Sequence, residues 1–503
     1  MAVIIFCAKF LGLLREIMIA GVYGQGYASD VLNTSTQIPL LFFDMTLGVA
    51  ILSTFVPVFN MYLERDGRER AIEFSNNFMT IVMSAAALFS AVGIIFAEPI
   101  VRLMVPGWNA AKVAETASLL RILFPSIIFT AAAYTSVGIL QSFGEFNIPS
   151  VISVVSNLIM ILYLLIVGNR FGLAGVIVSM VIAWASQLFI QIPPLRRYGY
   201  RYRPALNLRD EGIAEAARLA VPVLISSWVQ PLCIVINMAF GSGMGDGAVT
   251  SLNWANKIYI IMVGVFAYAV TNFIFPKLSR MSAGDDNEAF AETTRLSLGW
   301  IILIIAYISA MFIALNKPII KVVFEHGAFT ADNTELTSSA LLYYSFGMVG
   351  YAICEVLNKS FYAIHDGKTP MLASVAGVVF NFAAAFVFVR AMNLGLGGLA
   401  LASASSSIFI ALILLVMINK RKHGVISRGF VINSLKALAA AAVCCVAARL
   451  VYGFADSLAG GGFVITLAKL ALAAFVALIL YVILGFALRL DETKQIRRFK
   501  NGK

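Results

Sequence analysis

The chain has 503 residues, of which 60% are hydrophobic and only 13% are charged, and its mean hydropathy is +0.89. A soluble globular protein carries roughly a quarter charged residues, so this composition excludes that class and indicates a polytopic membrane protein. The net charge of +11 does not indicate nucleic-acid binding, because the cations follow the loops in a pattern typical of membrane topology.

Apolar segments long enough to cross a bilayer follow one another along the whole chain. At about 20 residues a span, they predict an all-α membrane protein with about 14 transmembrane helices. The first segment carries charges and lacks a basic leader, so it is expected to be a retained span and not a cleaved signal peptide. The expected spans are 2–22, 31–60, 72–97, 113–141, 150–168, 172–193, 212–239, 248–275, 289–315, 333–362, 369–390, 396–419, 431–453 and 463–488.

Two charged residues stand out in the first span. Lys9 and Arg15 lie in an otherwise apolar segment, with Glu16 beside Arg15. A cation at the centre of a span costs about 2.5 kcal/mol or more, so such residues usually face a protein interior or a wet cavity. The alternative is that each cation reaches the membrane surface or pairs with a carboxylate, for example Arg15 with Glu16 or Asp30.

The second span has a carboxylate near its start and another in its middle. Asp30 is most simply explained as a cap of that helix. Asp44 lies deeper, where it could balance the cations or take up a proton. Asn237 and Asn381 lie deep in the seventh and eleventh spans; we favour helix–helix hydrogen bonds for both, with cation binding as the alternative.

The two halves of the chain resemble each other weakly. Gly24 and Gly241 end corresponding spans, and Pro57 and Pro276 do so with nearly the same separation along the sequence. This offset equals about six spans, an even number, so the halves have the same orientation in the membrane. We expect two pseudo-symmetric six-helix lobes around a central cavity, with Lys257 on the eighth span facing it. The expected division is 1–208 for spans 1–6, 209–424 for spans 7–12, and 425–503 for two further spans and a basic tail.

Lys and Arg gather in the even-numbered loops and in the C-terminal tail. The positive-inside rule therefore predicts that both termini lie in the cytoplasm. Inside the membrane, a set of cations favours an anionic ligand, because arginine binds phosphate oxygens bidentately and lysine acts as a point charge. The largest clusters in the loops and the tail are 65–70, 196–209, 420–428 and 489–503.

Motifs of the common enzyme classes are absent from the sequence. There is no HExxH, no P-loop and no Gly-x-Ser-x-Gly, and the histidines and cysteines show no metal spacing. We therefore expect a transporter and not an enzyme, with no cofactor and no metal. Without a P-loop, its energy would come from the membrane potential, a monovalent cation gradient or the gradient of the substrate.

Four motifs occur in order along the chain. They are residues 9–16 (KFLGLLRE), 254–257 (WANK) with 276–279 (PKLS), 324–330 (FEHGAFT), and 361–363 (FYA) with 366–370 (DGKTP). Over nearly its whole length the chain resembles the MurJ (MviN) lipid II flippases of the multidrug/oligosaccharidyl-lipid/polysaccharide (MOP) exporter superfamily.

The resemblance implies a multi-pass protein of the bacterial inner membrane that serves peptidoglycan biosynthesis. It would move lipid II, an undecaprenyl-pyrophosphoryl disaccharide-pentapeptide, to the outer leaflet by alternating access. Lys9, Arg15 and Lys257 match positions that bind the head group, Glu16 lies beside them, and Asp30 matches a functional acidic position. Spans 13 and 14 would form a groove for the lipid tail. Membrane lipids and cell-wall synthesis proteins are the expected partners.

The chain departs from the family at several cavity positions. No cation lies near Phe43 and Asp44, where arginine is common, and Lys257 also replaces an arginine. Asn237 and Ala385, one turn after Asn381, replace acidic residues of members proposed to bind sodium, so a sodium site of that kind is not expected.

Three alternatives compete with a lipid II flippase. One is a related exporter of another polyprenyl-linked oligosaccharide or of a drug, although a drug exporter would favour acidic cavity residues. Another is a membrane enzyme acting on lipid-linked sugars, which would need one of the loop carboxylates Glu98, Glu145 or Glu325 to have a catalytic partner. The third is a scaffold without transport activity, which would need no intramembrane cations.

Overall fold

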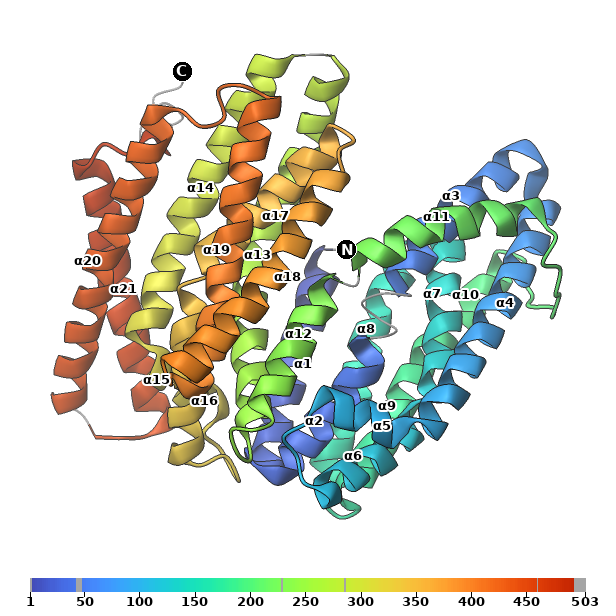
Figure 1. The fold of residues 1–503 in the computed structure, drawn as a ribbon, viewed down its shortest axis with the longest axis horizontal. Helices are drawn as coiled ribbons and strands as arrows, with labels where there is room; N and C mark the ends of the chain where they lie inside the picture. The colour runs from blue at the N-terminus through green and yellow to red at the C-terminus, as the bar shows by residue number, and fades with distance from the viewer. Residues whose placement is uncertain (1, 42–47, 228, 285, 459, 493–503) are drawn as a thin grey trace. The chain divides into compact units, whose positions relative to one another are not determined.

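The computed structural model describes residues 2–41, 48–227, 229–284, 286–458 and 460–492. It is 84% helical, and its described residues form no strand (Figure 1). The predicted all-α fold is therefore confirmed. The predictions for Asp44 and the neighbouring Phe43 fall outside the described residues.

The helices pack into two compact units, each described here by itself. The first unit comprises Met1–Thr250 and His326–Phe329, and its helices run from blue to green in Figure 1. Its helices are α1 (Ala2–Tyr23), α2 (Tyr27–Pro39), α3 (Val49–Arg65), α4 (Gly67–Ile95), α5 (Ala97–Met104), α6 (Ala110–Leu123), α7 (Ser126–Ser142), α8 (Asn147–Ile166), α9 (Gly172–Phe189), α10 (Ile192–Arg197), α11 (Glu211–Ser227) and α12 (Val229–Gly241).

The second unit comprises Ser251–Glu325 and Thr330–Lys503. The boundary between the units lies just inside α13, whereas the lobe boundary at 208/209 stays a prediction. The helices of the second unit are α13 (Ala248–Ala283), α14 (Asn287–Ala314), α15 (Asn316–Phe324), α16 (Ala331–Ser345), α17 (Met348–Ala363), α18 (Lys368–Phe386), the π-helix η2 (Val387–Ala391), α19 (Gly395–Arg421), α20 (Arg428–Leu458) and α21 (Phe463–Ala487).

Helices overlap each of the expected spans in the described part of the chain. Within the described ranges, nine are long and apolar enough to cross a membrane, and the number rises to 11 if two bent pairs each form one span. These pairs are α6–α7, bent by 43° next to Pro125, and α16–α17, bent by 49°. The three other expected spans coincide with α1, which carries Lys9, Arg15 and Glu16, and with the pairs α2–α3 and α11–α12.

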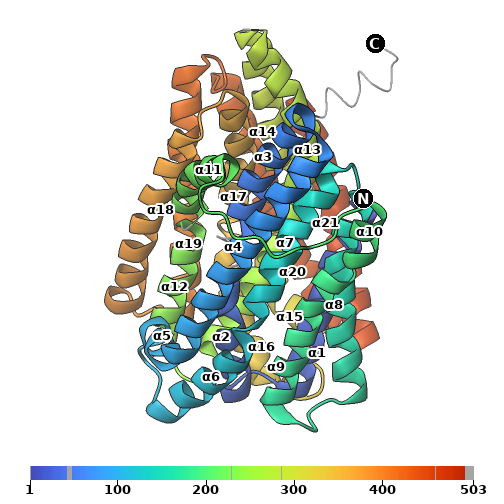
Figure 2. The same ribbon diagram turned by 90° about the vertical axis from the view of Figure 1, so that its right-hand side faces the viewer.

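Aromatic packing forms the core of the first unit. The Phe55 ring of α3 stacks on Phe59 at 5.3 Å between centroids and on Phe74 of α4 at 5.7 Å. Gly138 lets α7 approach this cluster, because a Cβ there would lie 2.6 Å from the Phe55 ring. In another part of this unit, α8 packs against α1 on one side and against α9 on the other (Figure 2).

Small residues bring α20 and α21 against α14 in the second unit. Ala440, Cys444 and Ala448 of α20 and Ala473 and Ala477 of α21 are buried in one cluster. Such residues let helix backbones approach closely within a membrane. Tyrosine hydroxyls strengthen the contact: Tyr307 donates to the Ala474 carbonyl at 2.6 Å, and Tyr481 to the Leu303 carbonyl at 2.9 Å. The lipid-tail groove of these helices stays a prediction.

Candidate functional site

The Arg15 guanidinium contacts both its own helix and α8. Its Nη2 pairs with the Glu16 carboxylate at 2.7 Å, and its Nη1 donates to Asn157 Oδ1 at 3.1 Å. Side-chain exposure is 26% for Arg15 and 7% for Glu16. The pairing considered for Arg15 and Glu16 is therefore present. The guanidinium also keeps an exposed part, and its buried Nε has no hydrogen-bond partner within the described part of the chain.

Asn157 fixes the position of this guanidinium. Its amide nitrogen donates to the Ser153 carbonyl one turn earlier at 2.8 Å and to the Ala8 carbonyl of α1 at 3.4 Å. These bonds orient Oδ1 towards Arg15. The sequence analysis did not identify Asn157 as a functional residue. Its position as a polar residue within the expected fifth span, 150–168, could have indicated it.

The other predicted head-group cations, Lys9 and Lys257, are both half-buried. Lys9 precedes Arg15 by six residues, which is about 9 Å along a helix and about 120° around it. Lys257 lies on α13, in the second unit, one turn after the buried Trp254, whose ring stacks on Phe324 at 5.3 Å. The joint role of the three cations stays a prediction.

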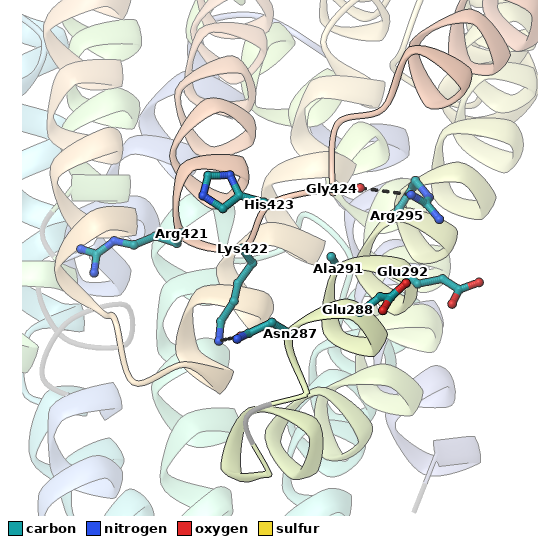
Figure 3. Close-up of a pocket in the computed structure, with 9 residues that line it drawn as sticks. All are labelled: Asn287, Glu288, Ala291, Glu292, Arg295, Arg421, Lys422, His423 and Gly424. Carbon is teal, nitrogen blue, oxygen red and sulfur yellow. Dashed lines mark hydrogen bonds between the residues drawn. The ribbon is translucent and has the colours of Figure 1, made fainter.

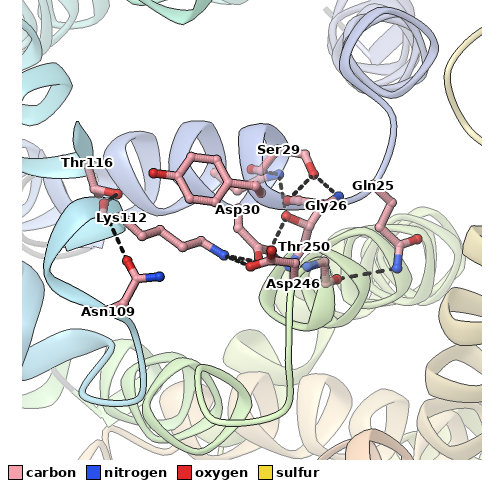
Figure 4. Close-up of polar contacts among 12 residues, drawn as sticks. Gln25, Gly26, Ser29, Asp30, Asn109, Lys112, Thr116, Asp246 and Thr250 are labelled. Atoms are coloured by element: carbon pink, nitrogen blue, oxygen red, sulfur yellow. Dashed lines mark hydrogen bonds and ion pairs between the residues drawn. The ribbon is translucent and has the colours of Figure 1, made fainter. Parts of the chain in front are cut away.

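Asp30 lies at the centre of a buried polar cluster (Figure 4). Its Oδ2 accepts from Lys112 Nζ and from the Gly247 backbone N–H, both at 2.8 Å. Its Oδ1 accepts from the Thr250 hydroxyl at 2.7 Å and from the Thr250 backbone N–H at 3.0 Å. Neither carboxylate oxygen is exposed, since Asp30 is 0% accessible. A direct contact between Asp30 and substrate therefore needs another conformation.

The expectation that Asp30 caps its own helix is wrong. The N-cap of α2 is Gly26, whose backbone N–H donates to the Ser29 hydroxyl at 2.9 Å. The Asp30 carboxylate instead accepts the N–H groups at the start of α13, which the α-helix itself leaves unsatisfied. A sequence pattern cannot show this, because the capped helix begins only at Ala248, far along the chain from Asp30.

Lys112 is the residue of this cluster that sequence reasoning missed. Figure 4 shows its side chain reaching Asp30 and Asp246, and its Nζ lies 2.7 Å from Asp246 Oδ1. The ammonium also lies 4.2 Å from the centre of the Trp108 ring. The Lys112 side chain is only 3% exposed. The sequence places Lys112 in a loop just before the expected span 113–141, and no local pattern there indicates that it is buried.

Turns that are distant in the sequence meet around the same end of the first unit. The Ala328 N–H donates to the Gly21 carbonyl at 2.8 Å. Gly24 and Gly327, with φ of +63° and +61°, form the close contact between these segments. In two further turns of this unit, the Gly107 N–H donates to the Ser242 hydroxyl at 2.9 Å. The expected first, third, seventh and ninth loops thus converge, as loops on one side of a membrane would.

Asn381 of α18 makes the expected kind of helix–helix contact. It is fully buried, and its Nδ2 donates to the Ser403 hydroxyl of α19 at 3.3 Å. Its Oδ1 has no hydrogen-bond partner among the described residues. Asn237 lies half-buried on α12. Cation binding by either residue stays a prediction, and the described residues include no group of three or more His, Cys, Asp or Glu arranged for a metal ion.

The loop carboxylates considered for an enzyme have structural partners. Glu98 pairs with Arg102 at 2.8 Å, and Glu145 accepts the Asn147 backbone N–H at 2.9 Å at the start of α8. Glu325 accepts the Thr334 hydroxyl at 2.6 Å. Each of the three carboxylates therefore has a structural contact with a residue close to it in the sequence.

A polar pocket of about 470 Å³ lies in the second unit, between the start of α14 and the segment that joins α19 to α20 (Figure 3). Its cations already have partners: Arg295 donates to the Gly424 carbonyl at 3.1 Å, and Arg421 lies 3.3 Å from Asp366. Lys422 donates to Asn287. Two carboxylates, Glu288 and Glu292, also line it. With Asp366, which pairs with Arg421 from outside the lining, three carboxylates offset the three cations Arg295, Arg421 and Lys422.

Known proteins of one family match most of the chain. The family model described as lipid II flippase MurJ matches residues 19–473. A probable lipid II flippase MurJ of Buchnera aphidicola is 25% identical over 399 residues, covering 78% of this chain and 77% of the relative. The lipid II flippase MurJ of Burkholderia cenocepacia is 24% identical over 393 residues, covering 76% of each.

Solved structures share the fold. A lipid II flippase MurJ in an inward closed conformation superposes with a TM-score of 0.79 at 22% identity, covering 97% of this chain and 99% of that one. An inward-facing multidrug resistance MATE transporter of the MOP superfamily gives a TM-score of 0.69 at 16% identity, covering 82% and 94%. The match of the family model from residue 19 to residue 473 shows that this chain belongs to the MurJ lipid II flippase family.

Proposed function

We propose that this protein translocates lipid II from the cytoplasmic to the outer leaflet of the inner membrane by alternating access. The family match over residues 19–473 carries this proposal. The series of membrane-spanning helices and the guanidinium within α1 agree with it. Peptidoglycan synthesis is then the process that consumes the product, and both termini lie in the cytoplasm.

The pyrophosphate of the head group is the proposed ligand of Arg15, Lys9 and Lys257. Glu16 neutralises Arg15 in the absence of substrate, which lowers the cost of a cation inside the membrane. A pyrophosphate carries more negative charge than this single carboxylate and offers several acceptor oxygens. The exposed edge of the guanidinium remains for it, while Asn157 keeps the group in place.

The cluster around Asp30 is proposed to close the outer end of the transport path. It joins α2 and α6 to the turn between α12 and α13, all within the first unit. In the predicted lobe division, the α12–α13 turn belongs to the second lobe, so opening this end would break these bonds. Asp44, Asn237 and Asn381 remain candidates for coupling to the membrane potential or to a monovalent cation, and α20 with α21 for the lipid tail.

The proposal is tested by complementation in cells depleted of their own lipid II flippase, with the outer-leaflet pool of lipid II measured directly. The wild-type chain is expected to restore this pool. Arg15→Ala and Lys257→Ala are expected to insert normally yet restore little of it. Arg121→Ala is the matched control, because Arg121 is an exposed cation of α6 that donates to the Ile94 carbonyl.

Each outcome has a distinct meaning. Failure of the inserted wild-type chain would contradict the substrate and favour a related exporter of another polyprenyl-linked sugar. Full activity of both alanine variants would contradict the role of the cations and leave the substrate intact. Equal loss in Arg121→Ala would show that removal of any membrane cation impairs the protein.

A further inference from the structure

A second pocket, of about 580 Å³, lies inside the first unit between α4, α7, α9 and α10. Its volume is within the range of roughly 300–1,000 Å³ that is typical of small-molecule sites. It is separate from the contacts of Arg15 and from the Asp30 cluster, because none of its lining residues takes part in either.

The lining of this pocket is mostly apolar, and its hydroxyl groups belong to Ser136, Tyr200 and Tyr202. The Tyr200 hydroxyl donates to Met79 Sδ at 3.7 Å, and the Tyr202 hydroxyl bonds to Thr80. Met79 and Met83 line it from α4, and flexible methionine side chains adapt to irregular apolar ligands. Leu188 and Ile192 line the opposite wall. Ser136 of α7 is 0% exposed, and its hydroxyl has no hydrogen-bond partner among the described residues. A buried hydroxyl without a partner costs free energy, which a ligand oxygen would recover.

Two guanidinium groups lie at the edge of the pocket. Arg196 lies in the last turn of α10 and Arg201 follows shortly after, and both side chains are exposed. Within the described chain, neither makes a side-chain hydrogen bond or an ion pair, unlike the arginines of the polar pocket in the second unit. Three further arginines in the same segment, Arg197, Arg203 and Arg209, add to the positive potential there.

Hydrogen bonds hold this edge against α4. Asn77 and Asn207 exchange two bonds of 2.8 Å, one through each group of the Asn77 amide. The Ala205 N–H donates to the Thr80 hydroxyl at 3.2 Å, and Tyr202 shares a bond of 3.0 Å with the same hydroxyl. The segment is therefore ordered before any ligand arrives, which lowers the entropic cost of binding.

We propose that this pocket binds an anionic glycerophospholipid of the cytoplasmic leaflet. The lipid phosphate lies between Arg196 and Arg201, and an acyl chain extends along Met79 and Met83. Because Ser136 is 0% exposed, its hydroxyl donates to an ester oxygen only in a conformation that opens the wall of the pocket at α7. The apolar interior favours a lipid over inorganic phosphate, and the unpaired arginines favour an anionic over a zwitterionic head group. The choice of leaflet uses the proposed orientation, in which residues 196–209 are cytoplasmic; the binding chemistry does not depend on lipid II transport.

Native mass spectrometry of the purified full-length protein tests the site, with phosphatidylglycerol and phosphatidylcholine of identical acyl chains as probes. The wild type is expected to retain phosphatidylglycerol preferentially. The double variant Arg196→Gln/Arg201→Gln is expected to lose at least about tenfold in apparent affinity, equivalent to about 1.4 kcal/mol. The double variant Arg197→Gln/Arg209→Gln is the matched control, because it removes the same charge from the same segment without altering the pocket lining.

Two further variants test the pocket interior. Met83→Trp, which fills the space from α4, is expected to weaken phosphatidylglycerol binding, and Ser136→Ala to weaken it to a smaller extent. Thermal unfolding of each variant shows whether it is folded. If Met83→Trp unfolds the protein, the arginine variants still decide the question.

Three results would overturn the proposal. They are equal retention of both lipids by the wild type, equal loss in the pocket and control double variants, and displacement of the lipid by millimolar inorganic phosphate. Equal loss of affinity in the two double variants would mean that the lipid is held by the general positive charge of the segment. Displacement by inorganic phosphate would mean that the site binds phosphate and not a lipid. All are measured without lipid II, so such a failure is distinguishable from failure of the proposed transport.

Discussion

Asp30 and Lys112 form a buried ion pair, with 2.8 Å between Oδ2 and Nζ and side-chain exposures of 0% and 3%. Burial of an ion pair is favourable only when additional hydrogen bonds satisfy both groups. Here Gly247 and Thr250 donate further hydrogen bonds to the Asp30 carboxylate. The Lys112 ammonium also pairs with Asp246 and lies over the Trp108 ring. The pair therefore joins three segments that are distant in the sequence.

Removal of the lysine should leave a buried carboxylate uncompensated. We expect Lys112→Met to destabilise the protein by about 3–5 kcal/mol, the usual cost of breaking a buried pair from one side. Thermal unfolding in detergent measures this as a lower midpoint temperature. Lys317→Met is a suitable control, because the Lys317–Glu335 pair is exposed on both sides and exposed pairs contribute about 0–1 kcal/mol.

A double-mutant cycle separates this pairing from simple loss of packing. The variant Asp30→Asn/Lys112→Met keeps groups of similar size without the buried charges, so it should unfold at a higher temperature than Lys112→Met alone. Additive effects of the two substitutions would contradict the coupling inferred from the structure.

Even the substitution of lysine for Arg15 should impair transport. Arg15→Lys keeps the charge but cannot donate to Asn157 and Glu16 from one planar group. We expect at least about a tenfold loss in the initial rate at which lipid II reaches the outer leaflet, corresponding to about 1.4 kcal/mol. Arg121→Lys, at an exposed position of α6, should retain the wild-type rate. A fully active Arg15→Lys would show that charge alone suffices.

Much of the helical fold could be predicted from the sequence, because each span carries its own signal of length and hydrophobicity. Within the candidate site, the pairing of Arg15 with Glu16 was also foreseeable, since the two residues are adjacent.

The long-range contacts could not be predicted in this way. Asp30 was expected to cap α2, but it caps α13, whose first residue, Ala248, is distant in the sequence. Lys112 appeared to be a loop cation, yet tertiary packing buries it. In both cases the partner is brought close by the fold, and no local pattern of charge or hydrophobicity encodes it.

The contact between Gly24 and Ala328 should depend on glycine. A Cβ at Gly24 would lie 2.5 Å from the Ala328 carbonyl oxygen, and its φ is +63°. Gly24→Ala therefore combines a backbone cost of about 1–2 kcal/mol with a steric clash. Gly172→Ala is the matched control: Gly172 has a similar φ of +57°, but a Cβ there would meet nothing within 4 Å. Thermal unfolding should show a larger loss for Gly24→Ala, and equal losses would contradict the close contact.

The Asp366 carboxylate should stabilise the protein in a pH-dependent manner. Asp366 lies between α17 and α18 and accepts the Thr369 hydroxyl at 2.7 Å and the Thr369 backbone N–H at 3.0 Å. Burial would raise its pKa, but these bonds and Arg421 outweigh burial and lower the pKa of Asp366 below its ordinary value of 3.8. The folded state therefore favours the ionised form, and this contribution is fully present above the ordinary pKa and lost as the pH falls through the lowered one.

Asp366→Ala is expected to lower the free energy of unfolding by about 0.5–2 kcal/mol at pH 7, the usual cost of losing a side chain that caps a helix. The difference from wild type should persist down to about pH 5 and shrink below about pH 4, as the wild-type carboxylate becomes protonated in the unfolded and then in the folded protein. Asp332→Ala is the control, because Asp332 is exposed and makes no side-chain hydrogen bond or ion pair within the described ranges. Unfolding midpoints measured from pH 3 to pH 7 in one detergent check this, and a difference that grows as the pH falls would contradict the role assigned to the ionised carboxylate.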